Sequence, residues 1–105
     1  MELHQLRCFV AAAEELHFGK AARRLEMLPS ALGRQIRMLE EELGTQLLLR
    51  TTRHVMLSQD GAMFFDHARS LLERADALAR QFRDRGRRRS GGISACSRRI
   101  SAHGF

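Results

Sequence analysis

The stretch that decides the fold runs from residue 18 to residue 44 and reads FGKAARRLEMLPSALGRQIRMLEEELG. Its second half predicts a helix from Pro29 to about Leu43, because proline is tolerated at a first helical position and apolar residues then recur at spacings of four, three and four. The predicted buried stripe consists of Leu32, Ile36, Leu39 and Leu43. Gly44 follows at the position that a left-handed C-cap favours.

The first half of this stretch predicts a shorter helix over residues 19–26. Small apolar residues occupy one side of it and bases the other: Ala21, Ala22 and Leu25 against Lys20, Arg23 and Arg24. Two helices separated by three or four residues, of which the second presents Arg34 and Arg37 outward, match a helix-turn-helix.

The neighbouring segments extend this unit on both sides. Residues 2–15 carry apolar residues at spacings of three and four and predict another amphipathic helix. Residues 46–50 and 54–57 predict two short strands joined by a basic tip, which together form a wing, although the run of leucines lacks alternation and is also compatible with a helix. The expected fold is mainly α: a winged helix-turn-helix of three helices and a two-stranded wing.

A long helix is predicted after the wing, with Ser58 as N-cap and Asp60 in the first turn. It runs from Gln59 to about Arg85, roughly 40 Å at 1.5 Å per residue. Apolar residues recur along it at heptad-like spacing: Phe64, Phe65, Ala68, Leu71, Leu72, Ala75, Leu78 and Phe82. So long a helix cannot lie wholly on so small a domain, so we expect a second copy to bury this stripe and form a homodimer, with higher oligomers left open.

Composition adds bounds on the class of protein. The chain has 105 residues and a net charge of +6, with 44% hydrophobic residues, which suits one small globular domain with an appendage. All 12 acidic residues lie before position 86, and the last twenty residues hold five arginines. We therefore expect a winged domain at 1–57, a dimerisation helix at 58–85 and a disordered basic tail at 86–105.

The sequence lacks the residue patterns that several classes of function require. Cys8 and Cys96 form no CxxC pair and the five histidines form no HxxxH, so neither a disulfide framework nor a metal site is expected. We see no phosphate-binding loop, nucleophile elbow or paired carboxylates, so we expect no enzyme and no cofactor. The absence of a membrane-length apolar run and of a signal peptide predicts a cytoplasmic protein without a membrane partner.

The order of several short motifs carries a resemblance to a known family. They are Leu3-x-x-Leu6-x-x-Phe9, Phe18-Gly19-Lys20-Ala21-Ala22-x-x-Leu25, Ala31-Leu32-x-Arg34-Gln35-Ile36-x-x-Leu39-Glu40, Leu43-Gly44-x-x-Leu47, Arg50-x-x-Arg53 and Leu57-x-x-x-Gly61. Over residues 1 to about 85 the chain resembles the N-terminal region of LysR-type transcriptional regulators. The resemblance implies a winged helix-turn-helix, a linker helix that pairs subunits, and a following effector domain. Residues 86–105 show no pattern of such a domain, so no small-molecule effector is expected.

The resemblance and the basic residues together give the candidate DNA-contacting residues: Lys20, Ser30, Ala31, Gly33, Arg34, Arg37, Arg50, Thr52 and Arg53. Arg34 and Arg37 share one face of the predicted recognition helix, and arginine can hold guanine O6 and N7 or a phosphate. The alternative for them is an ordinary solvated helix face. Ser30 offers a hydroxyl and Ala31 a contact with a thymine methyl.

The other candidates have their own alternatives. The wing residues suit phosphate or minor-groove contact, or a polar hairpin tip. Lys20 suits a phosphate held at the start of the second helix, or a solvated lysine. Glu40, Glu41 and Glu42 are expected on a solvent face away from DNA.

Two positions depart from the family pattern. Pro29 stands where a glutamine is usual and Gly33 where a serine is usual, so both groove-facing polar groups are missing.

The leading hypothesis is a homodimeric, sequence-specific binder of double-stranded DNA at an interrupted palindrome. The departures at 29 and 33 keep open an interaction protein that pairs through its long helix and binds DNA weakly or not at all. A fragment without function is the third alternative.

Overall fold

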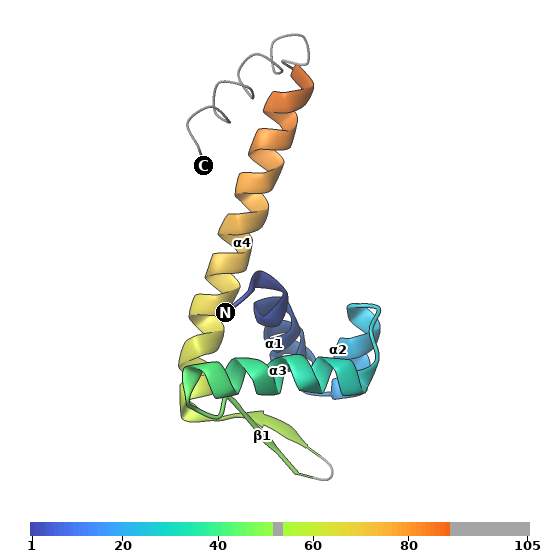
Figure 1. Cartoon of the computed structure of the whole chain (residues 1–105), viewed down its shortest axis with the longest axis vertical. Helices are drawn as coiled ribbons and strands as arrows, with labels where there is room; N and C mark the ends of the chain where they lie inside the picture. The colour runs from blue at the N-terminus through green and yellow to red at the C-terminus, as the bar shows by residue number, and fades with distance from the viewer. Residues whose placement is uncertain (52–53, 89–105) are drawn as a thin grey trace. The chain divides into compact units, whose positions relative to one another are not determined.

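The computed structural model describes residues 1–51 and 54–88, apart from the side chain of Arg88. The elements follow in the order α1 (Leu3–Glu15), α2 (Phe18–Arg24), α3 (Pro29–Leu43), β1 (Leu48–Arg50), β2 (Val55–Leu57) and α4 (Gln59–Arg88) (Figure 1). The chain divides into two compact units, Met1–Leu72 and a second that begins at Glu73. The mainly helical, winged fold expected from the sequence is confirmed.

The pair α2 and α3 begins and ends for local reasons. Pro29 occupies the first turn of α3, and Gly44 caps its end with a left-handed φ of 72°. Leu32, Ile36 and Leu39 are fully buried, as their spacing predicts, whereas Leu43, the fourth residue of the predicted stripe, is 38% exposed in the last turn of the helix. The α2 helix begins one residue earlier than expected because His17 is its N-cap, with Nδ1 accepting the Lys20 N–H at 3.0 Å.

The core of the first unit is built around α1. Eight of its residues are buried, from Gln5 to Ala13 with Arg7 excepted. Phe9 meets two rings of α4 edge-on, with centroids 5.4 Å from Phe64 and 6.5 Å from Phe65. Because α1 also packs against α2 and α3, it joins the helix-turn-helix to the first turns of α4.

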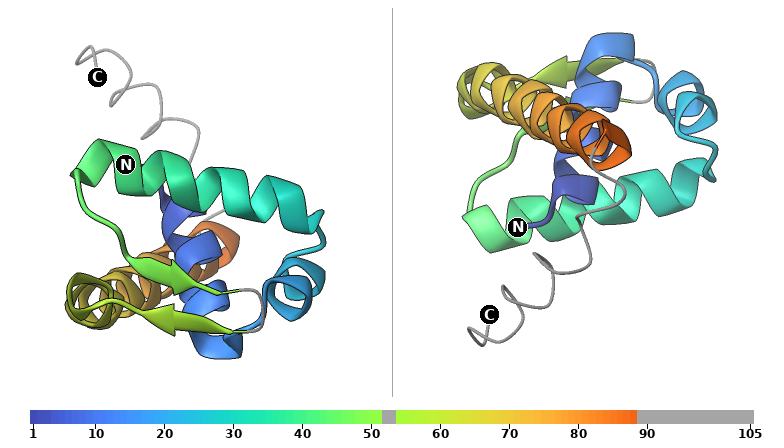
Figure 2. Two further views of the ribbon diagram at one scale, coloured as in Figure 1. Left: turned by 90° about the horizontal axis from the view of Figure 1, so that it is seen from below. Right: turned by 90° about the horizontal axis from the view of Figure 1, so that it is seen from above.

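The wing is an antiparallel pair in which Leu48 faces Leu57 and Arg50 faces Val55 (Figure 2). Leu48 is buried while Leu49 is exposed, so the leucine run alternates once the strand begins. That strand starts at Leu48 rather than at Gln46, because the preceding residues bind Ser58, which precedes α4. The Ser58 N–H donates to the Leu47 carbonyl at 2.9 Å, and the Ser58 hydroxyl donates to the Gln46 carbonyl at 2.6 Å.

The beginning of α4 is capped as the sequence predicts. Ser58 Oγ accepts the Gly61 N–H at 2.9 Å, and Asp60 lies in the first turn, where the Thr45 hydroxyl donates to it at 2.6 Å. The helix continues through Gly86 to Arg88, beyond the end expected near Arg85. The tail predicted at 86–105 is therefore helical in its first three residues, and positions 89–105 lie outside the described residues. The first turns of α4 belong to the unit that ends at Leu72.

Candidate nucleic-acid interface

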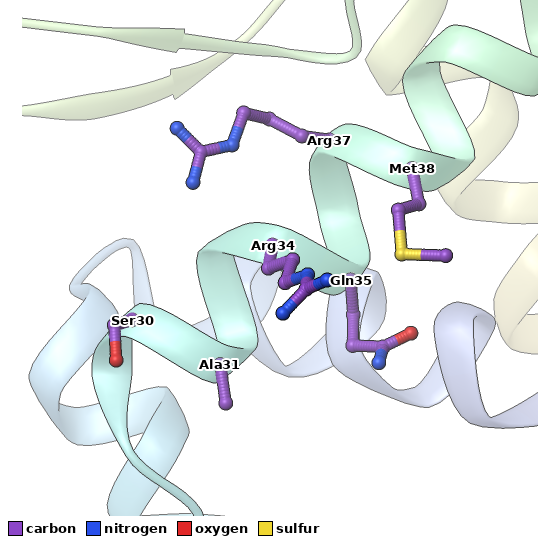
Figure 3. Close-up of a pocket in the computed structure, with 6 residues that line it drawn as sticks. All are labelled: Ser30, Ala31, Arg34, Gln35, Arg37 and Met38. Atoms are coloured by element: carbon purple, nitrogen blue, oxygen red, sulfur yellow. The ribbon is translucent and has the colours of Figure 1, made fainter.

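The exposed side of α3 carries an open hollow between two rows of side chains. Its lining consists of Ser30, Ala31, Arg34, Gln35, Arg37 and Met38. Figure 3 shows Ala31, Gln35 and Met38 projecting on one side of the helix and Arg37 on the other, with Arg34 between them. Four of the predicted DNA-contacting residues therefore share one surface, which we call the α3 face.

The α3 face offers three kinds of contact. Arg34 and Arg37 are exposed, and neither makes an ion pair within residues 1–51 and 54–88. An amide such as that of Gln35 can bind adenine N6 and N7, and methyl groups such as that of Ala31 can contact thymine. The face therefore combines free cations, an amide and apolar atoms, which are the groups that base edges and phosphates require.

Gln35 and Met38 were not among the predicted DNA-contacting residues. The signal was present, because positions 31, 35 and 38 lie at the i, i+4 and i+7 spacing of one helix face. Gln35 is half-buried, and Met38 is exposed.

Lys20 presents its side chain to solvent, but the backbone group expected to assist it is already occupied. Its N–H donates to His17 Nδ1 at 3.0 Å. The start of α2 therefore offers the Lys20 ammonium group without that backbone donor.

Gly33 does not belong to the α3 face. Gly33 is buried, and a Cβ built on it would lie 3.3 Å from Phe18 Cε2 and 3.7 Å from Arg50 Nη1. A side chain at position 33 would thus start toward α2 and the wing, which corrects the expectation that this position is groove-facing.

On the wing, Arg50 is exposed, and its guanidinium also contacts the protein. Its guanidinium carbon is 4.5 Å from the centroid of the Phe18 ring. Beyond Arg50 the hairpin closes through the Thr51 N–H, which donates to the His54 carbonyl at 2.9 Å. The other two wing candidates, Thr52 and Arg53, lie outside the described residues.

The acidic run at the end of α3 is divided between two roles. Glu41 and Glu42 are exposed as expected. Glu40 is not simply a solvent-facing residue: its Oε2 accepts the N–H groups of Leu47 and Leu48 at 2.7 and 3.1 Å. Its side chain therefore ties the base of the wing to α3.

The apolar residues predicted for dimerisation also divide into two groups. Four of them belong to the core of the first unit. Phe64 and Phe65 are partly buried there, and Ala68 and Leu72 are buried. The core of the same chain therefore already covers part of the surface predicted for dimerisation. The remaining residues, Leu71, Ala75, Leu78 and Phe82, follow one another at spacings of four, three and four; we call them the α4 stripe. Leu71, Leu78 and Phe82 are 46, 58 and 55% exposed.

Cys8 is fully buried, and desolvation raises the pKa of its thiol. Within the described part of the chain, no helix has the length and apolar character needed to cross a membrane, and no three His, Cys, Asp or Glu side chains gather into a metal-binding group.

A turn-linked helix pair, an arginine-bearing second helix and an antiparallel hairpin after it define a winged helix-turn-helix protein. Residues 3–62 match the family model of the bacterial regulatory helix-turn-helix proteins of the lysR family. The chain belongs to this family.

Named relatives and solved structures agree with that assignment. The chain is 58% identical over 85 residues to the HTH-type transcriptional regulator TtuA of Agrobacterium vitis, covering 81% of this chain and 28% of the relative. It is 56% identical to the regulator AlsR of Bacillus subtilis, covering 69% and 24% respectively. The chain thus spans about a quarter of the length of these relatives.

Several of the similar structures are complexes with DNA. The crystal structure of the BenM_DBD/catB site 1 DNA complex has a TM-score of 0.77 and 44% identity, covering 80% of this chain and 94% of that one. The CbnR_DBD-DNA complex has a TM-score of 0.76 and 36% identity, covering 82% and 99%.

Proposed function

We propose that the chain binds double-stranded DNA in a sequence-specific manner and regulates transcription. The observation that carries this proposal is the α3 face, where Arg34 and Arg37 stand exposed beside Gln35 and Ala31. Burying this set in a major groove would pair cations with phosphates or guanines and the amide with an adenine. The similar structures that contain DNA support the proposal.

The proposal includes a homodimer on an interrupted palindrome. The α4 stripe has the alternating spacing of a coiled-coil seam, and three of its four residues are exposed in the single chain. A two-fold pairing there would present two α3 faces to two half-sites. We place the protein in the cytoplasm, where it would reach bacterial DNA, and assign it no catalytic reaction.

A second candidate is an interaction protein that pairs through the α4 stripe and scarcely binds DNA. Pro29 favours it, because a proline at the first turn of α3 offers neither a backbone N–H nor a polar side chain to the groove. Leu28 beside it is 70% exposed and equally apolar.

A fluorescence-anisotropy titration separates the two candidates. The purified chain is titrated with an interrupted palindrome selected from a random library and with a scrambled duplex, at low and physiological salt. The proposal expects a preference for the palindrome that survives physiological salt. Equal binding to both duplexes that disappears with salt would leave only counterion release by the arginines, and the interaction protein would then be favoured.

A further inference from the structure

Arg50 is the last residue of β1, and Phe18 is the first residue of α2. The guanidinium carbon of Arg50 lies 4.5 Å from the centroid of the Phe18 ring. At this distance a cation is attracted to the negative face of an aromatic ring. A guanidinium engaged in this way is drawn toward α2, whereas a phosphate contact would require it to reach outward.

Gly33 completes this contact from the recognition helix. It is buried, and a Cβ at this position would lie 3.3 Å from Phe18 Cε2 and 3.7 Å from Arg50 Nη1. Residues from α2, α3 and β1 therefore meet at one point, which we call the Arg50 contact. The absence of a side chain at Gly33 leaves room for the Phe18 ring, the closer of the two neighbours, although glycine within a helix is unfavourable relative to alanine.

A lone two-stranded hairpin is only marginally stable in water, and this wing is held by the packing of Leu48, Val55 and Leu57 against the core and by contacts at its two ends. Its base is held by Glu40, whose carboxylate accepts the N–H groups of Leu47 and Leu48. Arg50 lies at the other end of the strand, directly before Thr51, whose N–H closes the hairpin onto the His54 carbonyl at 2.9 Å. The Arg50 contact is thus placed to hold the end of the wing that Glu40 does not reach.

We propose that Arg50 is a positioning residue, which fixes the tip end of the wing against the helix-turn-helix through Phe18, in the space that Gly33 leaves, and does not contact a phosphate itself. A wing held in place before binding loses less conformational freedom on binding. The effect on DNA affinity rests on the proposed function, whereas the contact itself requires no DNA.

The first test therefore uses the full chain without DNA. Nuclear magnetic resonance should show the Arg50 side-chain protons shifted upfield by the Phe18 ring, with the shift lost in Phe18→Leu and kept in Phe18→Tyr. Arg50→Ala should speed exchange of the Thr51 amide hydrogen by roughly two- to fivefold, which is the strength expected of an exposed cation–π contact. Unshifted Arg50 protons, or an unchanged Thr51 exchange rate, would overturn the inference whether or not the chain binds DNA.

The second test asks how Arg50 acts on DNA, with a duplex selected by the wild-type chain. Arg50→Ala and Phe18→Leu should each weaken binding by about two- to fivefold. The double variant should be no weaker than either single one, and the slope of log K against log salt should not change. Arg37→Ala is the control for a phosphate contact, which is expected to reduce that slope by about one.

A phosphate contact by Arg50 would give a different result. If Arg50→Ala reduces the slope by about one while Phe18→Leu leaves binding unchanged, Arg50 is a phosphate contact and the inference is wrong. If the wild-type chain binds no duplex, the proposed function fails, and the ring-current shift and Thr51 exchange still decide whether Arg50 positions the wing.

Discussion

Gly61 lies so close to Leu47 that a Cβ on it would be 2.0 Å from the Leu47 carbonyl oxygen. That oxygen already accepts the Ser58 N–H at 2.9 Å. The first turn of α4 therefore rests directly on the backbone that leads into the wing. No side chain can enter between the two segments without moving one of them.

Gly61→Ala should consequently destabilise the fold by about 3 kcal/mol, the upper range for overpacking. Urea denaturation followed by circular dichroism measures the loss. Gly44→Ala is the matched control, because Gly44 has a φ of 72° with nothing within 4 Å of its Cβ position. Gly44→Ala should lower the free energy of unfolding by about 1 to 2 kcal/mol, because alanine is strained in the left-handed backbone conformation. A Gly61→Ala variant as stable as Gly44→Ala would contradict the close approach.

Glu40 should matter more than its acidic neighbours. Glu40→Ala removes one charged acceptor from two backbone N–H groups, and we expect a loss of about 2 kcal/mol, within the range for hydrogen bonds to charged groups. Glu40→Gln keeps an acceptor oxygen and should lose less. Glu41→Ala, at an exposed position, should stay within about 0.5 kcal/mol of wild type. Equal denaturation midpoints for Glu40→Ala and Glu41→Ala would remove Glu40 from the support of the wing.

Leu28→Ser should stabilise the chain. Leu28 is the N-cap of α3, has no side-chain acceptor for the free N–H groups of the first turn, and is 70% exposed. Serine at an N-cap is worth about 1 kcal/mol relative to an apolar residue. The gain should appear as a higher urea midpoint with an unchanged slope, and Leu28→Ala should show little of it. A serine variant no more stable than the alanine variant would mean that the cap does not form.

These predictions also show which parts of the fold could be predicted from the sequence. The bounds of α3 depend on signals within a few residues, a proline at its start and a glycine after its end, and both predictions are confirmed. The Ser58 cap of α4 is equally local. Helix ends of this kind need no knowledge of the rest of the chain.

Contacts between distant segments could not be predicted in this way. Glu40 looked like part of a charged run, but it binds backbone groups seven and eight residues later. Phe64 and Ala68 continue the heptad-like pattern of the long helix, yet both pack into the core with α1. Periodicity identifies the apolar face of a helix, but only the folded structure shows which segment packs against that face.

The division of α4 gives a sharp test of dimerisation. Leu78→Asp places a charge on the α4 stripe, at a residue that is 58% exposed in the single chain, and should convert a dimer into a monomer without loss of helix. Met63→Asp is the matched control, since Met63 is 63% exposed on the same helix but lies outside the stripe. Sedimentation velocity at micromolar concentration measures both. A dimer that survives Leu78→Asp would mean that the chain pairs through another surface.

Arg34 provides the corresponding test on the α3 face. Arg34→Ala removes an exposed cation that lies nearer the N-terminus of the recognition helix than Arg37 does, so it should weaken specific binding by about 1 to 3 kcal/mol. Gln35→Ala should act differently, relaxing the choice of base at one position because the amide would pair with adenine. Arg80→Ala, at an exposed position of α4, removes the same charge away from this face and serves as control. Anisotropy titrations against the selected duplex and single-base variants measure all three. If Arg34→Ala binds as tightly as Arg80→Ala, the effect of arginine is one of bulk charge, and the α3 face is not where the bases are recognised.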